Sequence, residues 1–388
     1  MFKKTNNGIF AAVLREWKRM TTKPIYVFMV FLAPLIVVVF FSTLLHDGLP
    51  HELPVGIVDL DKTTVSRNVI RNVDVGQAIR LQSYSSYGEA KDAMQRGEIY
   101  AFMLIPDNFS AKLMREEQPE IPYYTQYAYY LCGSLAMRDL NVGLKTISGG
   151  INLRQRTAHG ETYQEAMAQV QPIAMDFHSI ANPTTNYSFY LSSVLMPGVI
   201  FLLVIISTVY AVGSEMKERT SARWLVIAKG SLFNGLVGKL LPYTIFFTLV
   251  LFLADEVMLH ILGFPFLGDY IWMFVSSLLS VMAYQAVGVF ILAALPIMNT
   301  ALGIAAFYAV LGLGFCGITY PVEAMLPAAQ SFSFLYPARF YYLIYAGMQL
   351  NGLSFVQDWQ PFFFYLLFLL LPFLLHRRLK RFCVHPIG

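Results

Sequence analysis

The stretch IYVFMVFLAPLIVVVFFSTLL, residues 25–45, is an apolar run long enough to cross a membrane, and the mostly polar segment 47–188 follows it. A helix needs about 20 apolar residues to cross the roughly 30 Å of hydrocarbon in a bilayer. The other apolar runs occur after residue 188. They lie at 189–213, 240–262, 271–295, 300–320 and 359–375. The pattern predicts six transmembrane helices with a folded domain inserted between the first two.

The composition agrees with a polytopic α-helical membrane protein. Hydrophobic residues make up 56% of the chain and charged residues 13%, whereas soluble domains are about one quarter charged. The first run exceeds the usual length of a signal-peptide core, and no small-residue cleavage motif follows it, so we expect an uncleaved anchor. We divide the chain into an interfacial helix (1–24), a first transmembrane helix (25–46), an inserted domain (47–188), a five-helix membrane region (189–376) and a tail (377–388).

The distribution of basic residues predicts the orientation. Fifteen fall on one predicted side, against Arg339 alone in the short connections of the other side. The fifteen are Lys3, Lys4, Arg15, Lys18, Arg19 and Lys23 before the first run, Lys217, Arg219, Arg223, Lys229 and Lys239 in the loop 214–239, and Arg377, Arg378, Lys380 and Arg381 in the tail. Cytoplasmic loops carry the excess of Lys and Arg, so we expect both termini and this loop to be cytoplasmic.

The segment 47–188 would then lie outside the cytoplasm, and its pattern indicates an α/β domain. Short apolar runs at 55–58, 79–84, 99–106 and 121–130 predict strands, and helical spacing at 62–73, 86–96 and 107–117 predicts helices between them. Two amphipathic stretches, 132–157 and 160–181, predict a helical hairpin that leads back to the membrane. Its 12 basic and 16 acidic residues leave a net charge of −4, which argues against binding nucleic acid.

Two other segments are apolar without spanning the membrane cleanly. In GIFAAVLREWKRMTTK, residues 8–23, Ile9, Val13, Trp17 and Met20 recur at helical spacing, which predicts a helix in the inner interface with Trp17 at headgroup depth. The aromatic segment 321–350 contains three prolines. We expect it to form a re-entrant hairpin on the outer face.

The segment VGSEMKERTSARWLVIAKGS, residues 212–231, predicts a charged amphipathic helix on the cytoplasmic side. A loop that only obeyed the positive-inside rule would need its basic residues alone. Glu215 and Glu218 are additional to that requirement, so we interpret the segment as a docking surface for a cytoplasmic partner.

Motifs for catalysis and cofactor binding fail on inspection. Gly230 and Gly235 have the spacing of a nucleotide-binding loop, but Leu236 stands where Lys is required. We therefore expect neither a cofactor nor a metal in this chain. Asp255 and Glu256 lie roughly 24–26 Å along a helix from Lys239. That depth predicts charges at the outer rim that reach water, with an intramembrane ion relay as the alternative.

Three stretches resemble a known family. They are LPVGIVDLDKTTVSRNVIR (53–71), YGEAKDAMQRGEIYAFMLIPDNFSAKLM (87–114) and GSEMKERTSARWL (213–225). The chain resembles membrane (permease) subunits of type-2 ATP-binding-cassette (ABC) exporters, in the branch with a large periplasmic domain between the first and second spans. Thr220 stands where Gly-Thr is commoner in that family.

The resemblance implies a bacterial inner-membrane protein that pairs with a second permease subunit, identical or different. Each subunit would bind a separate cytoplasmic ABC ATPase, which holds ATP and Mg²⁺. The implied ATPase-coupling residues are Glu215, Glu218, Arg219 and Thr220, with Arg15, Trp17 and Arg19 as a second contact. A periplasmic adaptor and an outer-membrane channel are further implied partners. The implied activity is export of hydrophobic or amphiphilic small molecules.

Two other functions remain open at this point. A secondary, ion-coupled efflux carrier would depend on Asp255 and Glu256. A membrane sensor or scaffold would need a cytoplasmic signalling domain, and the longest predicted cytoplasmic piece, 214–239, is too short for one.

Overall fold

The structure is a computed structural model that describes residues 8–46, 48–76, 78–115, 117–173, 182 and 186–385. Lys3 and Lys4, the end of the predicted helix 160–181, and the last three residues of the tail lie outside the described residues. The chain forms two compact units. We call Leu49–His178 the inserted unit, and Met1–Gly48 together with Ser179–Gly388 the helical unit.

A four-stranded sheet with the order β2-β1-β3-β4 organises the inserted unit. Its strands are β1 (Leu53–Asp59), β2 (Ile79–Tyr84), β3 (Ala101–Ile105) and β4 (Tyr123–Thr125). Strand β1 pairs in parallel with β2 and β3, and β4 pairs antiparallel to β3. Helices α4 (Thr64–Val73), α5 (Tyr87–Gln95) and α6 (Phe109–Met114) connect the strands, and α7 (Tyr130–Ala158) and α8 (Tyr163–Val170) follow.

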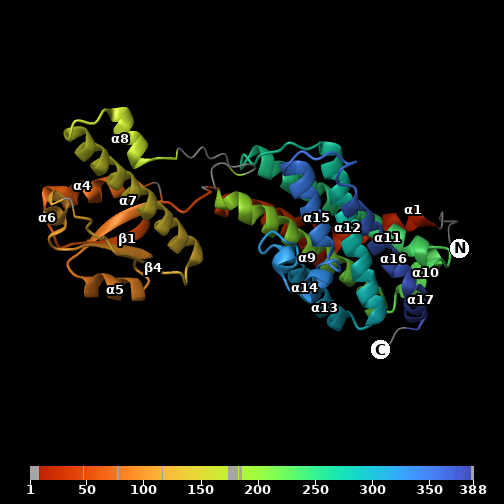
Figure 1. The fold of residues 1–388 in the computed structure, drawn as a ribbon. Coiled ribbons are helices and arrows are strands. Elements are labelled where there is room, and N and C mark those ends of the chain that lie inside the picture. The colour runs from red at the N-terminus through yellow and green to blue at the C-terminus, as the bar shows by residue number, and fades with distance from the viewer. Residues whose placement is uncertain are drawn as a thin grey trace. The chain divides into compact units, whose positions relative to one another are not determined.

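Alternation along the strands builds a core on each face of this sheet. Successive side chains of a strand point to opposite faces. Ile57 packs in a cluster with Val69 of α4 and Leu140 of α7, and the next residue, Val58, packs on the opposite face with Ala90 of α5. Figure 1 shows α4 and α7 over one face of the sheet and α5 over the other.

The Asp-x-Asp motif after β1 fixes the starts of two helices. Thr63 and Ser66 cap α4 reciprocally, and the Ser66 hydroxyl donates to Asp59 at 2.8 Å. The Asp61 carboxylate accepts from the Thr63 hydroxyl at 2.6 Å and from the Ser110 backbone N–H at 3.3 Å. Asp61 therefore joins the start of α4 to the start of α6, which gives the motif a role in folding.

The chain segments just before and just after the inserted unit are in contact within the helical unit. The Gly48 carbonyl accepts hydrogen bonds from the backbone N–H groups of Tyr187 and Ser188, at 2.9 and 3.1 Å. Gly48 has φ +75°, in the left-handed region that favours glycine. A Cβ at this position would lie 2.6 Å from the Asn186 side chain.

The helical unit is a bundle of long apolar helices with shorter ones at its ends. Its first part contains α1 (Ile9–Thr22), α2 (Pro24–Tyr26), the π-helix η1 (Val27–Leu32) and α3 (Ala33–Leu44). Its second part begins with α9 (Tyr187–Lys217), α10 (Ser221–Ile227), α11 (Leu232–His260), α12 (Tyr270–Ala294) and α13 (Met298–Gly314). It ends with the 3₁₀ helix η2 (Val322–Ala324), α14 (Pro327–Ser333), α15 (Pro337–Ile344), the π-helix η3 (Tyr345–Leu350), α16 (Gln360–Leu374) and α17 (His376–Val384).

Four of the described helices are long and apolar enough to cross a membrane. They are Pro24–Leu44, Tyr187–Lys217, Leu232–His260 and Tyr270–Ala294. The bent pair α16 and α17, which meet at 44°, gives a fifth if it counts as one span. The predicted span 300–320 is a shorter helix, α13, that ends at Gly314. The predicted loop 214–239 is mostly helical, because α9 continues to Lys217 and α11 begins at Leu232.

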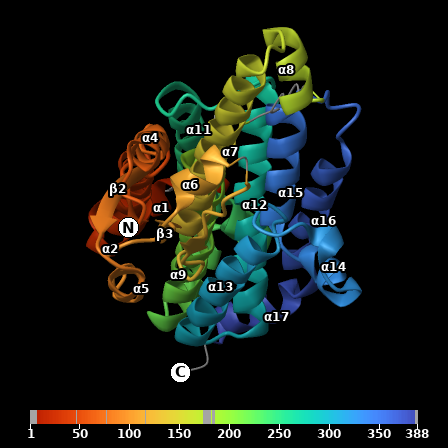
Figure 2. The same ribbon diagram turned by 60° about the vertical axis from the view of Figure 1, so that its left-hand side comes forward.

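Helix α13 nevertheless runs along much of α9, in the antiparallel direction. A Cβ on Gly213 would lie 2.8 Å from Met298, and a Cβ on Gly198 would lie 2.2 Å from Leu313. These two contacts are 15 residues apart on each helix, a rise of about 22 Å. Glycines at both contacts let the two backbones approach closely, as small residues do between membrane helices. Figure 2 shows α9, α12 and α11 side by side.

Helices from the three predicted cytoplasmic segments gather at one end of the helical unit, which we call the basic end. The Gly8 N–H donates to the Ile227 carbonyl of α10 at 2.9 Å. The Ser221 hydroxyl of α10 donates to the Cys383 carbonyl of α17 at 2.6 Å. Helices α1, α10 and α17 therefore lie together, as Figure 1 shows.

Candidate functional site

Helix α1 lies against the first turns of α11 at the basic end. Ala12, Glu16 and Met20 are its buried residues. A Cβ on Gly238 of α11 would lie 2.6 Å from the Cβ of Ala12. Because Gly238 has no side chain, the two helices come into direct contact here. This contact buries Glu16 between α1 and the bundle.

Five charged residues from three helices meet at this contact, and we call them the inner ion cluster. They are Arg15, Glu16 and Arg19 of α1, Glu215 of α9 and Lys239 of α11. The Lys239 ammonium contacts Glu16 at 2.6 Å and Glu215 at 3.1 Å. The Arg15 guanidinium lies 2.8 Å from Glu215, and Arg19 also pairs with Glu215. Each carboxylate thus has at least one cation beside it.

Neutral donors complete the coordination of the two carboxylates. The Tyr243 hydroxyl donates to Glu16 at 2.9 Å, and the Thr220 hydroxyl donates to Glu215. Arg19 also donates to the Ser214 hydroxyl at 3.3 Å. Buried charges are tolerated when they are both paired and hydrogen-bonded. The cluster therefore ties α1, α9 and α11 into one rigid corner.

Arg19 remains charged in this setting. Burial works to lower the pKa of Arg19, but the neighbouring Tyr26, Glu215 and Glu16 side chains raise it, and the net result lies above the ordinary value. Arg19 therefore keeps its positive charge at physiological pH.

The structure brings together only some of the residues that the sequence singled out. Arg15, Arg19, Glu215 and Thr220 are joined in or beside the inner ion cluster. The Glu215 side chain is 0% exposed within this chain, so it has no free surface for a partner. Glu218, whose side chain is 44% exposed, pairs with Lys23 at 2.9 Å.

The remaining predicted residues lie on the surface of the basic end. Trp17 is 50% exposed and lies outside the cluster. Arg219 is exposed with φ +55°, at the turn between α9 and α10. On α10, Arg223 and Val226 face outward, while Trp224 is buried. Helix α10 thus has a buried face toward the bundle and a free face at its end.

The side of α1 that packs against the protein is distinct from the apolar side that we expected at the membrane interface. Of the four residues expected there, Ile9, Val13, Trp17 and Met20, only Met20 is fully buried by the protein. The buried side instead follows the spacing of Ala12, Glu16 and Met20. The apolar residues Phe10, Leu14 and Trp17 stay exposed along another side, where a membrane interface would meet them.

Sequence reasoning missed Glu16, Lys239 and Tyr243. Lys239 counted only as one more positive charge in a loop, although an apolar run follows it immediately. Glu16 lies four residues from Ala12 and four from Met20, so small, acidic and apolar residues share one helical side. That spacing was the available signal for a buried carboxylate.

The expectation that Asp255 is a water-accessible rim charge is wrong. Asp255 of α11 is 1% exposed, and its carboxylate accepts from the Tyr341 hydroxyl of α15 at 2.6 Å and from Ser277 of α12 at 3.4 Å. The prediction used only the distance of Asp255 from Lys239 along one helix. That distance does not reveal that α12 and α15 cover Asp255. Glu256 is partly exposed and lies 3.2 Å from His260.

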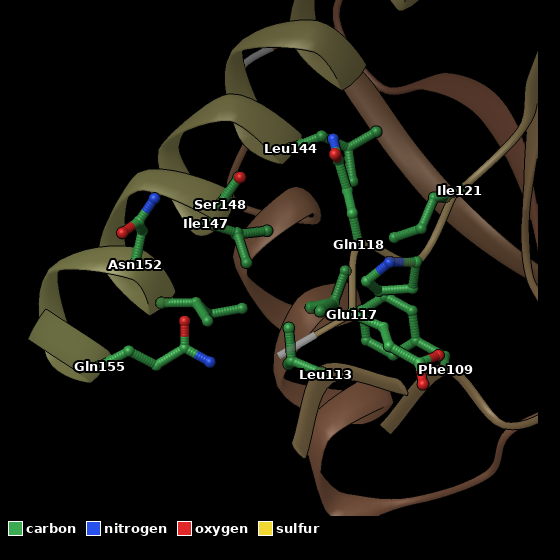
Figure 3. A pocket seen from close by; sticks show the side chains of 13 residues that line it. Phe109, Leu113, Glu117, Gln118, Ile121, Leu144, Ile147, Ser148, Asn152 and Gln155 are labelled. Atoms are coloured by element: carbon green, nitrogen blue, oxygen red, sulfur yellow. The ribbon is translucent and has the colours of Figure 1, made fainter. Parts of the chain in front are cut away.

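The inserted unit contains a cavity of about 560 Å³ between α6, α7 and the segment that leads to β4. Figure 3 shows Ile147, Ser148 and Asn152 along one side of α7, facing Phe109 and Leu113 of α6. Apolar side chains form its inner wall, and Gln118, Asn152 and Gln155 add amides. A volume of this size is in the range of small-molecule sites.

Comparison with known proteins agrees with this architecture. The family model described as "ABC-2 family transporter protein" matches residues 24–376. That range begins at the first helix of membrane-spanning length and ends at the start of α17. A search of curated proteins gives no match. The chain is thus a multi-pass membrane protein that belongs to the ABC-2 transporter family.

Proposed function

We propose that this chain is the permease subunit of an ABC exporter, driven by a separate ATPase that docks at the basic end. One observation carries the proposal: buried charges fix α1 to the end of α9, while the adjoining α10 keeps a free face. Force applied to α10 from outside would therefore reach α1, α9 and α11 together. Family membership supplies the transport function, and a permease of this kind requires an ATPase partner.

The basic end is proposed to face the cytoplasm, with both termini on that side. The gathering of α1, α10 and α17 supports this orientation, because Lys and Arg accumulate in cytoplasmic segments. The antiparallel contact of α13 with α9 supports six crossings rather than five. On this topology the inserted unit lies in the periplasm of a bacterial cell, and the membrane is the inner membrane.

The exposed face of α10 is the proposed ATPase contact. Val226 is 68% exposed and lies near Arg223, so an apolar side chain and a positive one are both available. Glu218 and Arg219 border this face. We assign Glu215 and Thr220 to transmission through the corner instead of direct contact, with Arg15 and Arg19 as their partners in α1.

The test is reconstitution of the purified chain in lipid nanodiscs with the ABC ATPase encoded beside it. We expect the ATPase to bind, and its rate of ATP hydrolysis to change on binding. Val226→Asp should weaken binding at least tenfold. Lys145→Ala, an exposed change on α7, should leave it unaltered. Binding that is indifferent to Val226→Asp, or ATP hydrolysis by the isolated chain, would refute the proposal.

The cargo is proposed to be hydrophobic or amphiphilic small molecules, exported by two permease subunits together. The cavity beside α7 is the proposed contact of the inserted unit with cargo or with a periplasmic adaptor. Ile147→Glu would place a charge on its apolar wall. Unchanged export by this variant, with normal ATPase coupling, would remove the cavity from the transport route.

Asp255 favours a second candidate, an ion-coupled efflux carrier. Buried intramembrane carboxylates often belong to proton relays. Within the described residues no cation pairs with Asp255, and only hydroxyl groups donate to it. Asp255→Asn keeps an acceptor for Tyr341 but cannot exchange a proton. Loss of transport in Asp255→Asn, together with full transport in the absence of any ATPase, would favour the carrier.

A further inference from the structure

A groove of about 420 Å³ lies between α11, α12 and α16 in the helical unit. Its walls are apolar, and Phe233, Leu241 and Phe373 along it are 40% exposed or more, so the groove opens to the outside of the bundle. On α11 it runs from Phe233 to Thr244, a rise of roughly 16 Å. That is about half of a hydrocarbon core roughly 30 Å thick, or one leaflet.

The wall of this groove contains a buried amide with an unused polar atom. Gln285 of α12 is 4% exposed, and its Oε1 accepts from the Thr244 hydroxyl at 2.8 Å. Its Nε2 has no hydrogen-bond partner among the described residues. Leaving a buried donor unpaired is energetically costly. Gln285 Nε2 can therefore donate a hydrogen bond to a carbonyl group of a ligand in the groove.

Helix α17, whose first residue lines the groove, is rich in basic residues. That first residue is His376, and Lys380 lies one turn further along the same side of the helix. Arg377 and Arg381 are also exposed, and α17 contains no acidic residue. Arg377, Lys380 and Arg381 take part in no ion pair within the part of the chain that the structure describes. Basic clusters next to a membrane helix attract anionic lipid headgroups.

We propose that this groove binds an anionic glycerophospholipid of the cytoplasmic leaflet. One acyl chain fills the groove, an ester carbonyl accepts from Gln285 Nε2, and the acidic headgroup lies on α17. The proposal rests on the cytoplasmic orientation of the basic end given above. It does not depend on an ATPase, because all of its residues belong to this chain.

The test is titration of the delipidated full chain with lipids of matched acyl chains, followed by native mass spectrometry. We expect phosphatidylglycerol to bind at least tenfold more tightly than phosphatidylcholine. Lys380→Gln combined with Arg381→Gln should remove that preference. Lys229→Gln, an exposed change at the same end of the bundle, should keep it. Met282→Trp fills the groove and should weaken both lipids, whereas Leu249→Trp on the exposed side of α11 should not.

The amide has its own test. The diester form of phosphatidylglycerol should bind several-fold more tightly than the diether form, which lacks carbonyl groups, and Gln285→Leu should bind the two alike. Equal binding of phosphatidylglycerol and phosphatidylcholine to the unaltered chain would overturn the proposal, as would full binding by Met282→Trp. Since no ATPase is present, a failure here is separate from a failure of ATPase coupling. Melting curves of each variant confirm that it is folded.

Discussion

The ammonium group of Lys239 lies 2.6 Å from a carboxylate oxygen of Glu16, although 223 positions separate the two residues in the chain. Both side chains are 1% exposed. This pair, with Glu215, fastens the N-terminal helix to the bundle. Its contribution to stability can be measured by removing one partner, because a buried charge without its partner is costly.

Replacing Lys239 by Met should destabilise the protein strongly. The change leaves Glu16 and Glu215 without their shared cation, at a cost of about 3–5 kcal/mol. We expect the melting temperature in detergent, followed by tryptophan fluorescence, to fall on the order of 5–10 °C. Lys229→Met, at an exposed position of the same end, should shift it little.

The double variant Lys239→Met with Glu16→Leu should recover part of this loss, since it removes a charge of each sign. Such a cycle measures the pairwise coupling of the two residues. If the stability lost by the double variant equalled the sum of the losses of the two single variants, the pair would be energetically unimportant.

Glu215→Gln and Glu218→Gln should separate transmission from contact. Glu215 is buried among three cations, so its neutral variant should lower both the melting temperature and the stimulation of the ATPase. The shorter ion pair of Glu218, with Lys23 at 2.9 Å, is exposed, and such pairs are worth about 0–1 kcal/mol. Its variant should keep the melting temperature and affect ATPase binding alone. Identical effects of the two changes on both measurements would contradict the division of roles.

Gly198→Val should disturb the packing of α9 on α13. Its side chain would occupy the space of Leu313, and overpacking a filled contact costs about 1–3 kcal/mol. We expect a lower melting temperature and faster proteolysis of the connection after α13. Gly303→Val is the matched control, because a Cβ at Gly303 meets nothing within 4 Å. A silent Gly198→Val would mean that α13 is free to move away from α9.

Asp61 should make the inserted unit sensitive to acid. Partial burial works to raise the pKa of Asp61, but hydrogen bonds from Ser110 and Thr63 together lower it below the ordinary value. A carboxylate with a depressed folded pKa stabilises the fold above its unfolded pKa, about 4, and loses this effect as the pH falls through the folded value.

Hydrogen exchange on the full chain measures this effect at the start of α6. Asp61→Asn should exchange faster there than the unaltered chain at pH 7, and the two should converge below about pH 4. A difference that persists at low pH would point to a packing effect of the substitution.

Local patterns were sufficient for the single elements of this fold. The apolar run at 25–45 forms the helices Pro24–Leu44, and the strand predicted at 79–84 is β2. In both cases, the hydrophobic period and the flanking polar residues act within one segment. The limits of α9 and α11 were harder to predict. Polar residues that pair within the bundle extend both helices beyond their apolar runs.

The candidate site could be predicted only in part, because burial of a charge depends on several segments at once. Arg15 and Arg19 came from a family resemblance, and Glu215 came from that resemblance and from the charge pattern of 212–231. Nothing in their spacing shows that the three residues meet. Glu16 becomes a buried partner only because Gly238 admits α1 against α11. Asp255 is hidden by α15, which lies far along the chain. Such contacts follow from tertiary packing and leave no periodic signal.

The backbone contact between Gly48 and Tyr187 has a consequence for how the gene could change. The two chain segments that flank the inserted unit are hydrogen-bonded to each other at Gly48 and Tyr187. We therefore expect the helical unit to fold without contacts from the inserted unit. A protein in which a short Gly-Ser bridge replaces everything between these residues should still enter the membrane and bind its ATPase. The inserted unit should therefore be removable as a single module.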